Sequence, residues 1–209
     1  MTISQSITLL DYLYGQVYGR HTLSSAWAED PSAEAPGEGG ETQGPLAALL
    51  AEAVAHTPMP ESTPFDSPSP PQLEVVEYVS RIAQYFECSP VCLVIALIYL
   101  DRALRGEGRA GGFTGAGGGP RPTRLTHFNF HRLFLSAMVL AVKFYDDDHF
   151  QNKYYAKVGG VTLEELGILE VAFLDLLGWS DLMVCPEEYT LVRESILTYA
   201  RGRWDGGKG

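Results

Sequence analysis

The sequence predicts an all-α protein whose single domain surrounds a buried central helix. Apolar residues recur at helical spacing through most of the chain, and no segment keeps the alternation of apolar and polar residues that marks a strand. The stretch FHRLFLSAMVLAVKFY, residues 130–145, is apolar on nearly every side, which is typical of a helix enclosed by its neighbours. The length of 209 residues fits one domain plus tails.

The N-terminal part of the chain predicts a short helix followed by a linker. Apolar residues at helical spacing in 6–19 favour an amphipathic helix, which either lies on the main domain or docks on a partner. Residues 28–44 are acidic, rich in Pro and Gly and without an aromatic residue, so they cannot support a core. We therefore expect an N-terminal region at 1–44, a folded domain at 45–200 and a flexible tail at 201–209.

Local signals divide the domain into helices. Ser89 with Pro90 predicts a helix start, as does Asn129, and Gly159 with Gly160 predicts a helix end. Thr162 with Glu165 forms a capping box. The predicted helices cover residues 45–56, 75–86, 90–105, 130–145, 152–158, 163–177 and 186 onward.

Two segments between these helices are predicted to lack regular structure. Residues 57–71 are rich in Pro, Ser and Thr and should be extended. Their four Ser-Pro or Thr-Pro pairs are minimal phosphoacceptor sites, although such pairs are also common in loops by chance. Residues 106–122 hold eight glycines and predict a flexible loop insertion.

Composition and charge limit the classes of function. The formal net charge of −11 argues against binding to nucleic acid, which depends on clustered Lys and Arg. Cys88, Cys92 and Cys185 match no disulfide framework or zinc spacing and suit a reducing compartment. No signal peptide or apolar run of membrane-spanning length is recognisable, so we expect an intracellular protein, in the nucleus, the cytoplasm or both, without membrane contact.

Acidic and histidine residues predict no metal or catalytic site. Asp146, Asp147 and Asp148 are consecutive, so their side chains point apart, and a solvated loop is expected. His127 and His131 lack the Glu-x-x-His pattern of a zinc-binding helix, so structural roles are expected. No nucleophile with a base and an orienting group is recognisable. We therefore expect no catalytic residue, no metal, no cofactor and no small-molecule substrate.

Lys143 and Glu170 lie beside apolar helix faces, where an uncompensated charge would cost several kcal/mol. In one arrangement Lys143 pairs with Asp146 or Asp147, near the end of its own helix, and Glu170 faces water. Periodicity alone favours this arrangement. In the other, both charges lie within an exposed apolar patch that a partner protein covers, where they would provide specificity more than affinity.

Three stretches of the chain resemble one known family. They are EYVSRIAQYFECSPVCLVIALIYLDR, THFNFHRLFLSAMVLAVKFYDDDHFQNKYYAKVGGV and LGILEVAFLDLLGW, at residues 77–102, 126–161 and 166–179. They resemble the box of the phosphate-signalling cyclins, a group that includes the plant U- and P-type cyclins. The resemblance extends over about residues 45–190. It implies a single cyclin box of five helices around a central third helix, with a flanking helix at either end.

The resemblance also implies a function and a site. The chain would be the non-enzymatic regulatory subunit of a heterodimer with a cyclin-dependent protein kinase, acting in cell-cycle or phosphate signalling. Lys143 and Glu170 match the family's Lys–Glu pair, which hydrogen-bonds kinase backbone, and this match favours the exposed arrangement of the two charges. Apolar kinase contacts are implied for Leu140, Phe144, Leu174 and Trp179. The alternative is a cyclin-fold adaptor for a non-kinase partner such as transcription machinery, since a fold alone does not fix function.

Overall fold

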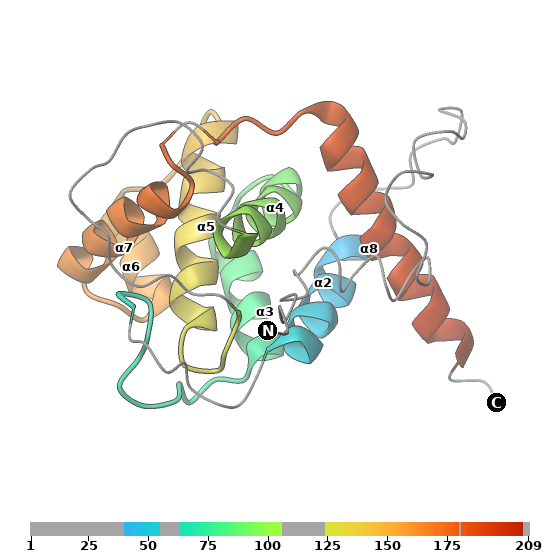
Figure 1. The fold of residues 1–209 in the computed structure, drawn as a ribbon, viewed down its shortest axis with the longest axis horizontal. Helices are drawn as coiled ribbons and strands as arrows, with labels where there is room; N and C mark the ends of the chain where they lie inside the picture. The colour runs from blue at the N-terminus through green and yellow to red at the C-terminus, as the bar shows by residue number, and fades with distance from the viewer. Residues whose placement is uncertain (1–39, 55–62, 106–123, 180, 207–209) are drawn as a thin grey trace, which may run out of the picture.

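The chain folds into helices joined by irregular segments. The computed structural model describes residues 40–54, 63–105, 124–179 and 181–206, and within these ranges it contains seven helices and no strand (Figure 1). The helices are α2 (Gly40–Ala53), α3 (Val75–Tyr85), α4 (Val91–Arg105), α5 (Phe130–Tyr145), α6 (Asn152–Gly159), α7 (Leu163–Leu176) and α8 (Pro186–Gly206). The all-α prediction is confirmed. The predicted helix at 6–19 and the glycine-rich insertion lie outside the described residues. In the described ranges, no helix is both long enough and apolar enough to cross a bilayer.

Helix α5 lies at the centre of the domain. It contacts α3, α4, α6 and α7, and Figure 1 shows α6 and α7 on one side of it with α2 and α8 on the other. From Phe130 to Val142 every side chain except that of Arg132 is buried. A helix that is apolar on all sides needs neighbours on all sides. The predicted central helix is therefore confirmed, with α3 to α7 as the five helices of the box.

The ends of α6 and α7 follow their local signals. The Glu165 N–H donates to Thr162 Oγ1 at 3.0 Å, which satisfies one of the open donors at the start of α7. Gly160 ends α6 with a φ of 75°, a left-handed conformation that glycine adopts without a steric penalty. The start of α2 differs from the prediction, because this helix begins at Gly40 and therefore includes Pro45 in its interior.

Two predicted capping side chains bond elsewhere. Asn129 precedes α5 as predicted, but its Oδ1 accepts a bond from the Thr126 N–H at 2.8 Å and does not cap the helix. Ser89 precedes α4, and its hydroxyl donates to Asp146 Oδ1 at 2.5 Å. The expectation of a solvated loop is therefore wrong for Asp146, which is half-buried and ties the start of α4 to the end of α5.

A turn ahead of α3 anchors part of the proline-rich segment in the core. Phe65 is 1% exposed, and its ring meets that of Phe173 edge-on with centroids 6.0 Å apart. Asp66 closes the turn, since its Oδ2 accepts bonds of 2.7 Å from both the backbone N–H and the hydroxyl of Thr63. Residues 63–66 thus form a turn, although the sequence predicts extended chain throughout 57–71.

The segment between α7 and α8 is held by α4. Arg102 Nη1 donates to the backbone carbonyls of Asp181 and Met183 at 2.8 Å and 3.0 Å. Its Nη2 donates to Glu188 Oε2, on α8, at 2.6 Å. The Tyr99 hydroxyl, one turn earlier on α4, adds a bond of 2.6 Å to the carbonyl of residue 182. These contacts fix where the chain runs after α7, and with it the position of the α7 C-terminus.

Candidate functional site

Helices α5 and α7 bring Lys143 and Glu170 together. Lys143 lies in the last turn of α5, Glu170 lies in the middle of α7, and the two helices are in contact. Lys143 Nζ donates to Glu170 Oε1 at 2.5 Å, and the two side chains are 29% and 12% exposed. The arrangement with Lys143 bound to Asp146 or Asp147 and Glu170 facing water is therefore wrong.

Asn152, the first residue of α6, also binds Glu170. Its Nδ2 donates to Glu170 Oε2 at 2.5 Å, so each carboxylate oxygen is bound by a donor from a different helix. Sequence pattern alone does not select Asn152, because an Asn at a helix start predicts a capping role. The position before α6 is in fact taken by Gln151, which leaves the Asn152 amide available for the carboxylate.

The four apolar residues predicted as partner contacts differ in exposure. Phe144 and Trp179 are 45% and 53% exposed, whereas Leu140 lies in the core with 8% exposed. Leu174 is half-buried and packs against the core. Phe144 and Trp179 therefore offer most of the accessible apolar surface in this set, and Leu140 mainly fills the interior behind the last turns of α5.

An unusual backbone turn holds Trp179 at the surface. Gly178 and Trp179 end α7 with φ values of 66° and 63°, in the left-handed region. That region costs a non-glycine residue about 1–2 kcal/mol. The Trp179 N–H donates to the Leu174 carbonyl at 3.0 Å, and its indole Nε1 donates to Asp175 Oδ1 at 2.6 Å. Strain of this kind concentrates at functional sites, and here it fixes an exposed tryptophan.

Helix α7 exposes two further apolar residues that the sequence pattern did not single out. Ile168 and Val171 are 58% and 52% exposed, and their spacing of three places them on one face of the helix. The buried stripe of α7 is made by the residues Leu166, Leu169, Phe173 and Leu176. A helix that has more apolar residues than its buried stripe can hold must expose the others. Such exposed apolar residues tend to mark interaction surfaces, so this excess is the sequence signal for the second face.

The Lys143–Glu170 pair is chemically suited to bind another chain's backbone. An ammonium carries three N–H donors, and within the described part of the chain Lys143 uses one of them, on Glu170. Because the pair is partly buried, its charges are screened less than those of a fully exposed pair. Spare donors beside exposed aromatic rings are typical of the anchoring residues of protein interfaces.

His131 has a structural position. Its Nε2 donates to the Leu73 carbonyl at 2.9 Å, and its ring packs against that of Tyr78 with centroids 4.2 Å apart. Burial lowers the pKa of His131 to about 4, so the ring is neutral at pH 7. His127 meets this ring edge-on, with centroids 6.0 Å apart. Neither histidine belongs to a cluster of metal-ligating side chains in the described residues.

Comparison with known proteins agrees with this architecture. The cyclin family model matches residues 21–180. The chain is 41% identical over 127 residues to Cyclin-U3-1 of Arabidopsis thaliana, an alignment that covers 61% of this chain and 51% of that protein. It is 38% identical over 139 residues to Cyclin-P4-1 of Oryza sativa subsp. japonica, covering 65% of this chain and 58% of that protein.

The relation to these proteins concerns the helical box. The chain spans only 51% to 58% of the length of the two relatives, so what they share with it is the domain and not their whole sequence. The family model, however, matches well over half of this chain, including the region from α2 to the end of α7. By its sequence and by its five-helix box centred on α5, the chain belongs to the cyclin family.

Proposed function

We propose that this cyclin binds and activates a cyclin-dependent protein kinase, with which it forms a heterodimer. Its docking face consists of Lys143, Phe144, Glu170, Leu174 and Trp179, with Leu140 packed behind them. The observation that supports the proposal most strongly is the Lys143–Glu170 ion pair at 2.5 Å, which lies part-buried where two helices meet. Exposed apolar side chains on the same elements supply the surrounding contact area.

The pair would act by fixing orientation. Two hydrogen bonds hold the Glu170 carboxylate in one position, so little side-chain entropy remains to be lost when a partner covers it. The remaining Lys143 donors would bind backbone carbonyls of the kinase, and the aromatic rings would exclude water around them. Charges in such a setting provide register and specificity more than raw affinity.

Activation would follow from selective binding. A kinase is active when its regulatory helix is turned inward, so that a Lys–Glu pair of its own is complete for phosphoryl transfer. A cyclin that binds only this conformation shifts the kinase population toward it. In this mechanism the catalytic groups belong to the kinase, and the cyclin contributes a surface. Cell-cycle or phosphate signalling is the setting that the resemblance to the phosphate-signalling cyclins suggests.

A charge exchange tests the docking face without removing the internal pair. In the double variant Lys143→Glu, Glu170→Lys, the two side chains can still pair with each other, but the charges presented to a partner are reversed. A matched control is Arg193→Glu, Glu194→Arg on α8, where neighbouring side chains form an ion pair at 2.9 Å. Each form is used for affinity capture from the source cell, and bound kinase activity is measured after circular dichroism confirms folding.

The proposal predicts that the wild type and the α8 control capture a cyclin-dependent kinase and that the docking-face exchange does not. Reversed charges in a desolvated interface should cost several kcal/mol, enough to abolish capture. Equal capture by all three forms would show that the kinase docks elsewhere. Capture of a non-kinase partner by the wild type, without any kinase, would favour the adaptor function.

A further inference from the structure

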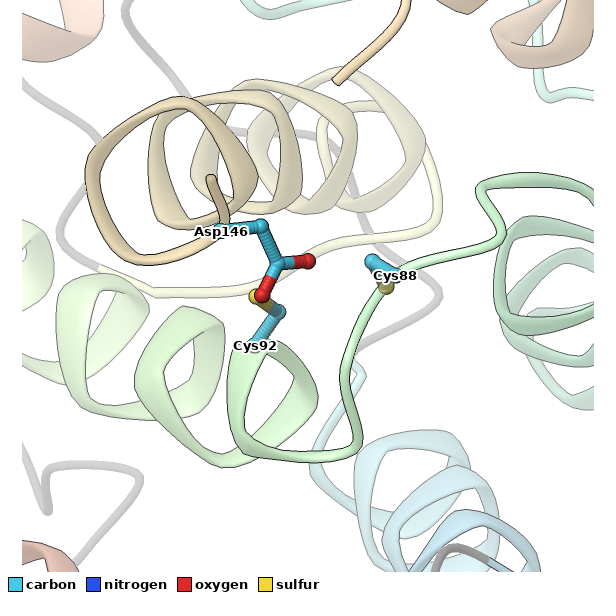
Figure 2. A group of neighbouring side chains, drawn as sticks. All are labelled: Cys88, Cys92 and Asp146. Carbon is cyan, nitrogen blue, oxygen red and sulfur yellow. The ribbon is translucent and has the colours of Figure 1, made fainter. Parts of the chain in front are cut away.

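Two thiols and a carboxylate meet where α4 begins and α5 ends (Figure 2). Cys88 precedes α4, Cys92 lies in its first turn, and Asp146 directly follows α5. One ligand atom from each residue can be chosen so that all three lie within 4.8 Å of one another. Cys92 is buried and the other two are half-buried. Asp146 is distant in the sequence, so cysteine spacing did not reveal this cluster.

The carboxylate in this cluster is already oriented. The Ser89 N–H donates to Asp146 Oδ2 at 2.9 Å, and the Ser89 hydroxyl donates to Asp146 Oδ1 at 2.5 Å. A carboxylate has about four lone-pair positions, so about two remain available for a further ligand. Hydrogen bonds from neighbouring groups orient metal ligands in the same way.

We propose that Cys88, Cys92 and Asp146 form a site for one zinc ion. Zinc is borderline-soft and accepts thiolate and carboxylate ligands, at about 2.3 Å for sulfur and about 2.0–2.2 Å for oxygen. Tetrahedral geometry then places the donor atoms roughly 3.5–3.8 Å apart. The three ligand atoms lie within 4.8 Å of one another, so small side-chain adjustments would bring them to these separations. The fourth position would be filled by water or by another ligand.

The two thiols lie close enough for each to affect the pKa of the other. A bond from the Cys92 thiol lowers the pKa of Cys88, whereas that same bond and burial raise the pKa of Cys92. Zinc binding should release protons and weaken as the pH falls, since the ligand is the thiolate.

A metal ion here would join α4 to α5 at a position that matters for the docking face. Asp146 lies three residues after Lys143, so a bond to Asp146 would immobilise the helix end that carries this lysine. The proposed ion has a structural role and is independent of the proposed function, because zinc binding can be measured without any kinase.

Cobalt serves as an optical probe for this site. The full chain is reduced with a phosphine, freed of metal with a chelator and titrated with Co²⁺, and zinc is then added in competition. We expect uptake of one equivalent, with sulfur-to-cobalt charge-transfer absorption, displacement by zinc and a raised melting temperature. Cys88→Ser and Asp146→Asn should lose this response, and Ser89→Ala should bind about 10–100-fold more weakly. The exposed Cys185 gives the control Cys185→Ser, which should respond as the wild type does.

Three results would overturn the proposal. The first is a folded, reduced wild type that shows no sulfur-to-cobalt absorption. The second is a Cys88→Ser variant with unchanged absorption, and the third is loss of the signal in Cys185→Ser. Cys88 is half-buried and precedes the helix, so its serine variant should fold. Circular dichroism and melting of that variant check this directly.

Discussion

At the residue scale, the proposed docking face depends on how the Glu170 carboxylate is bound. Lys143 and Asn152 each occupy one of its oxygens, from α5 and α6 respectively. Asn152 is neutral and adds no charge to the surface that a partner would contact, yet it fixes the direction in which the Glu170 carboxylate points. It is therefore a positioning residue, whose loss should affect partner binding more than folding.

Replacement of Asn152 tests this role. In Asn152→Ala one Glu170 oxygen loses its donor and the carboxylate can rotate, so we expect kinase affinity to fall about 10-fold, equivalent to about 1.4 kcal/mol. The matched control is Gln151→Ala at the exposed neighbouring position. Dissociation constants measured by calorimetry with the captured kinase decide the matter. Equal dissociation constants for the two variants would show that Asn152 does not contribute to partner binding.

The buried His131 predicts a dependence of stability on pH. Its folded pKa of about 4 lies below the unfolded value of 6.5, so the unfolded state takes up the proton first as the pH falls. The stability linked to this group is complete above about pH 6.5 and decreases from there down to about pH 4. Between pH 7 and pH 5 the loss should be on the order of 2 kcal/mol.

Urea unfolding at several pH values measures this loss. The variant His131→Gln keeps a side-chain donor for the Leu73 carbonyl but does not titrate in this range. Its free energy of unfolding should therefore fall less between pH 7 and pH 5 than that of the wild type. Parallel curves for the two proteins would show that His131 has an ordinary pKa in the folded state.

At the element scale, the sequence was sufficient to predict the helices but not how their ends are connected. The helical spacing of apolar residues and the Gly and Pro residues at helix ends are local properties of the sequence. They identified α3 to α7 with boundaries close to those observed. The contacts of Asn152 and Asp146 join residues far apart in the chain, 18 positions in one case and 57 in the other. No single-sequence pattern encodes such pairings, which explains why Asp146 was expected in a solvated loop and Asn152 was given no role.

Two glycines near α6 and α7 provide a test of helix packing. A Cβ on Gly159 would overlap the side chain of Leu135, whereas a Cβ on Gly167 would meet nothing within 4 Å. Gly159→Ala should destabilise the fold by about 1–3 kcal/mol through overpacking against α5. Gly167→Ala should stabilise it by about 0.5–1 kcal/mol, because alanine favours the helix. Thermal melting of the two variants tests both predicted stability changes, the decrease and the increase. Equal melting temperatures would refute the close approach of α6 to α5.

At the scale of the whole molecule, Arg102 connects α4 to the segment after α7 and to α8. It binds the segment after α7 through backbone carbonyls and binds α8 through Glu188, while its own side chain is only 12% exposed. Sequence pattern places Arg102 at the end of an apolar helix, where a basic residue is common for reasons of the helix dipole. Its true partners are about 80 residues further along the chain and emerge only from the fold.

Loss of Arg102 should loosen this connection. We expect Arg102→Ala to destabilise the protein by about 2–4 kcal/mol, because several acceptors lose their charged donor at once. Arg102→Lys keeps the charge but cannot form the same fork of bonds, so its stability should be intermediate. Urea unfolding gives the free energies. A lysine variant as stable as the wild type would mean that charge alone, and not the branched set of contacts, holds the segment.

The central claim is that this cyclin activates a kinase through the face that carries Lys143 and Glu170. The most direct measurement is the activity of the purified captured kinase on a peptide substrate as the cyclin concentration is raised. The wild type and the α8 control Arg193→Glu, Glu194→Arg should give the same saturating activation. The exchange Lys143→Glu, Glu170→Lys should require at least about 100-fold more protein, equivalent to about 3 kcal/mol. Activation by the folded exchange variant at wild-type concentrations would contradict the claim.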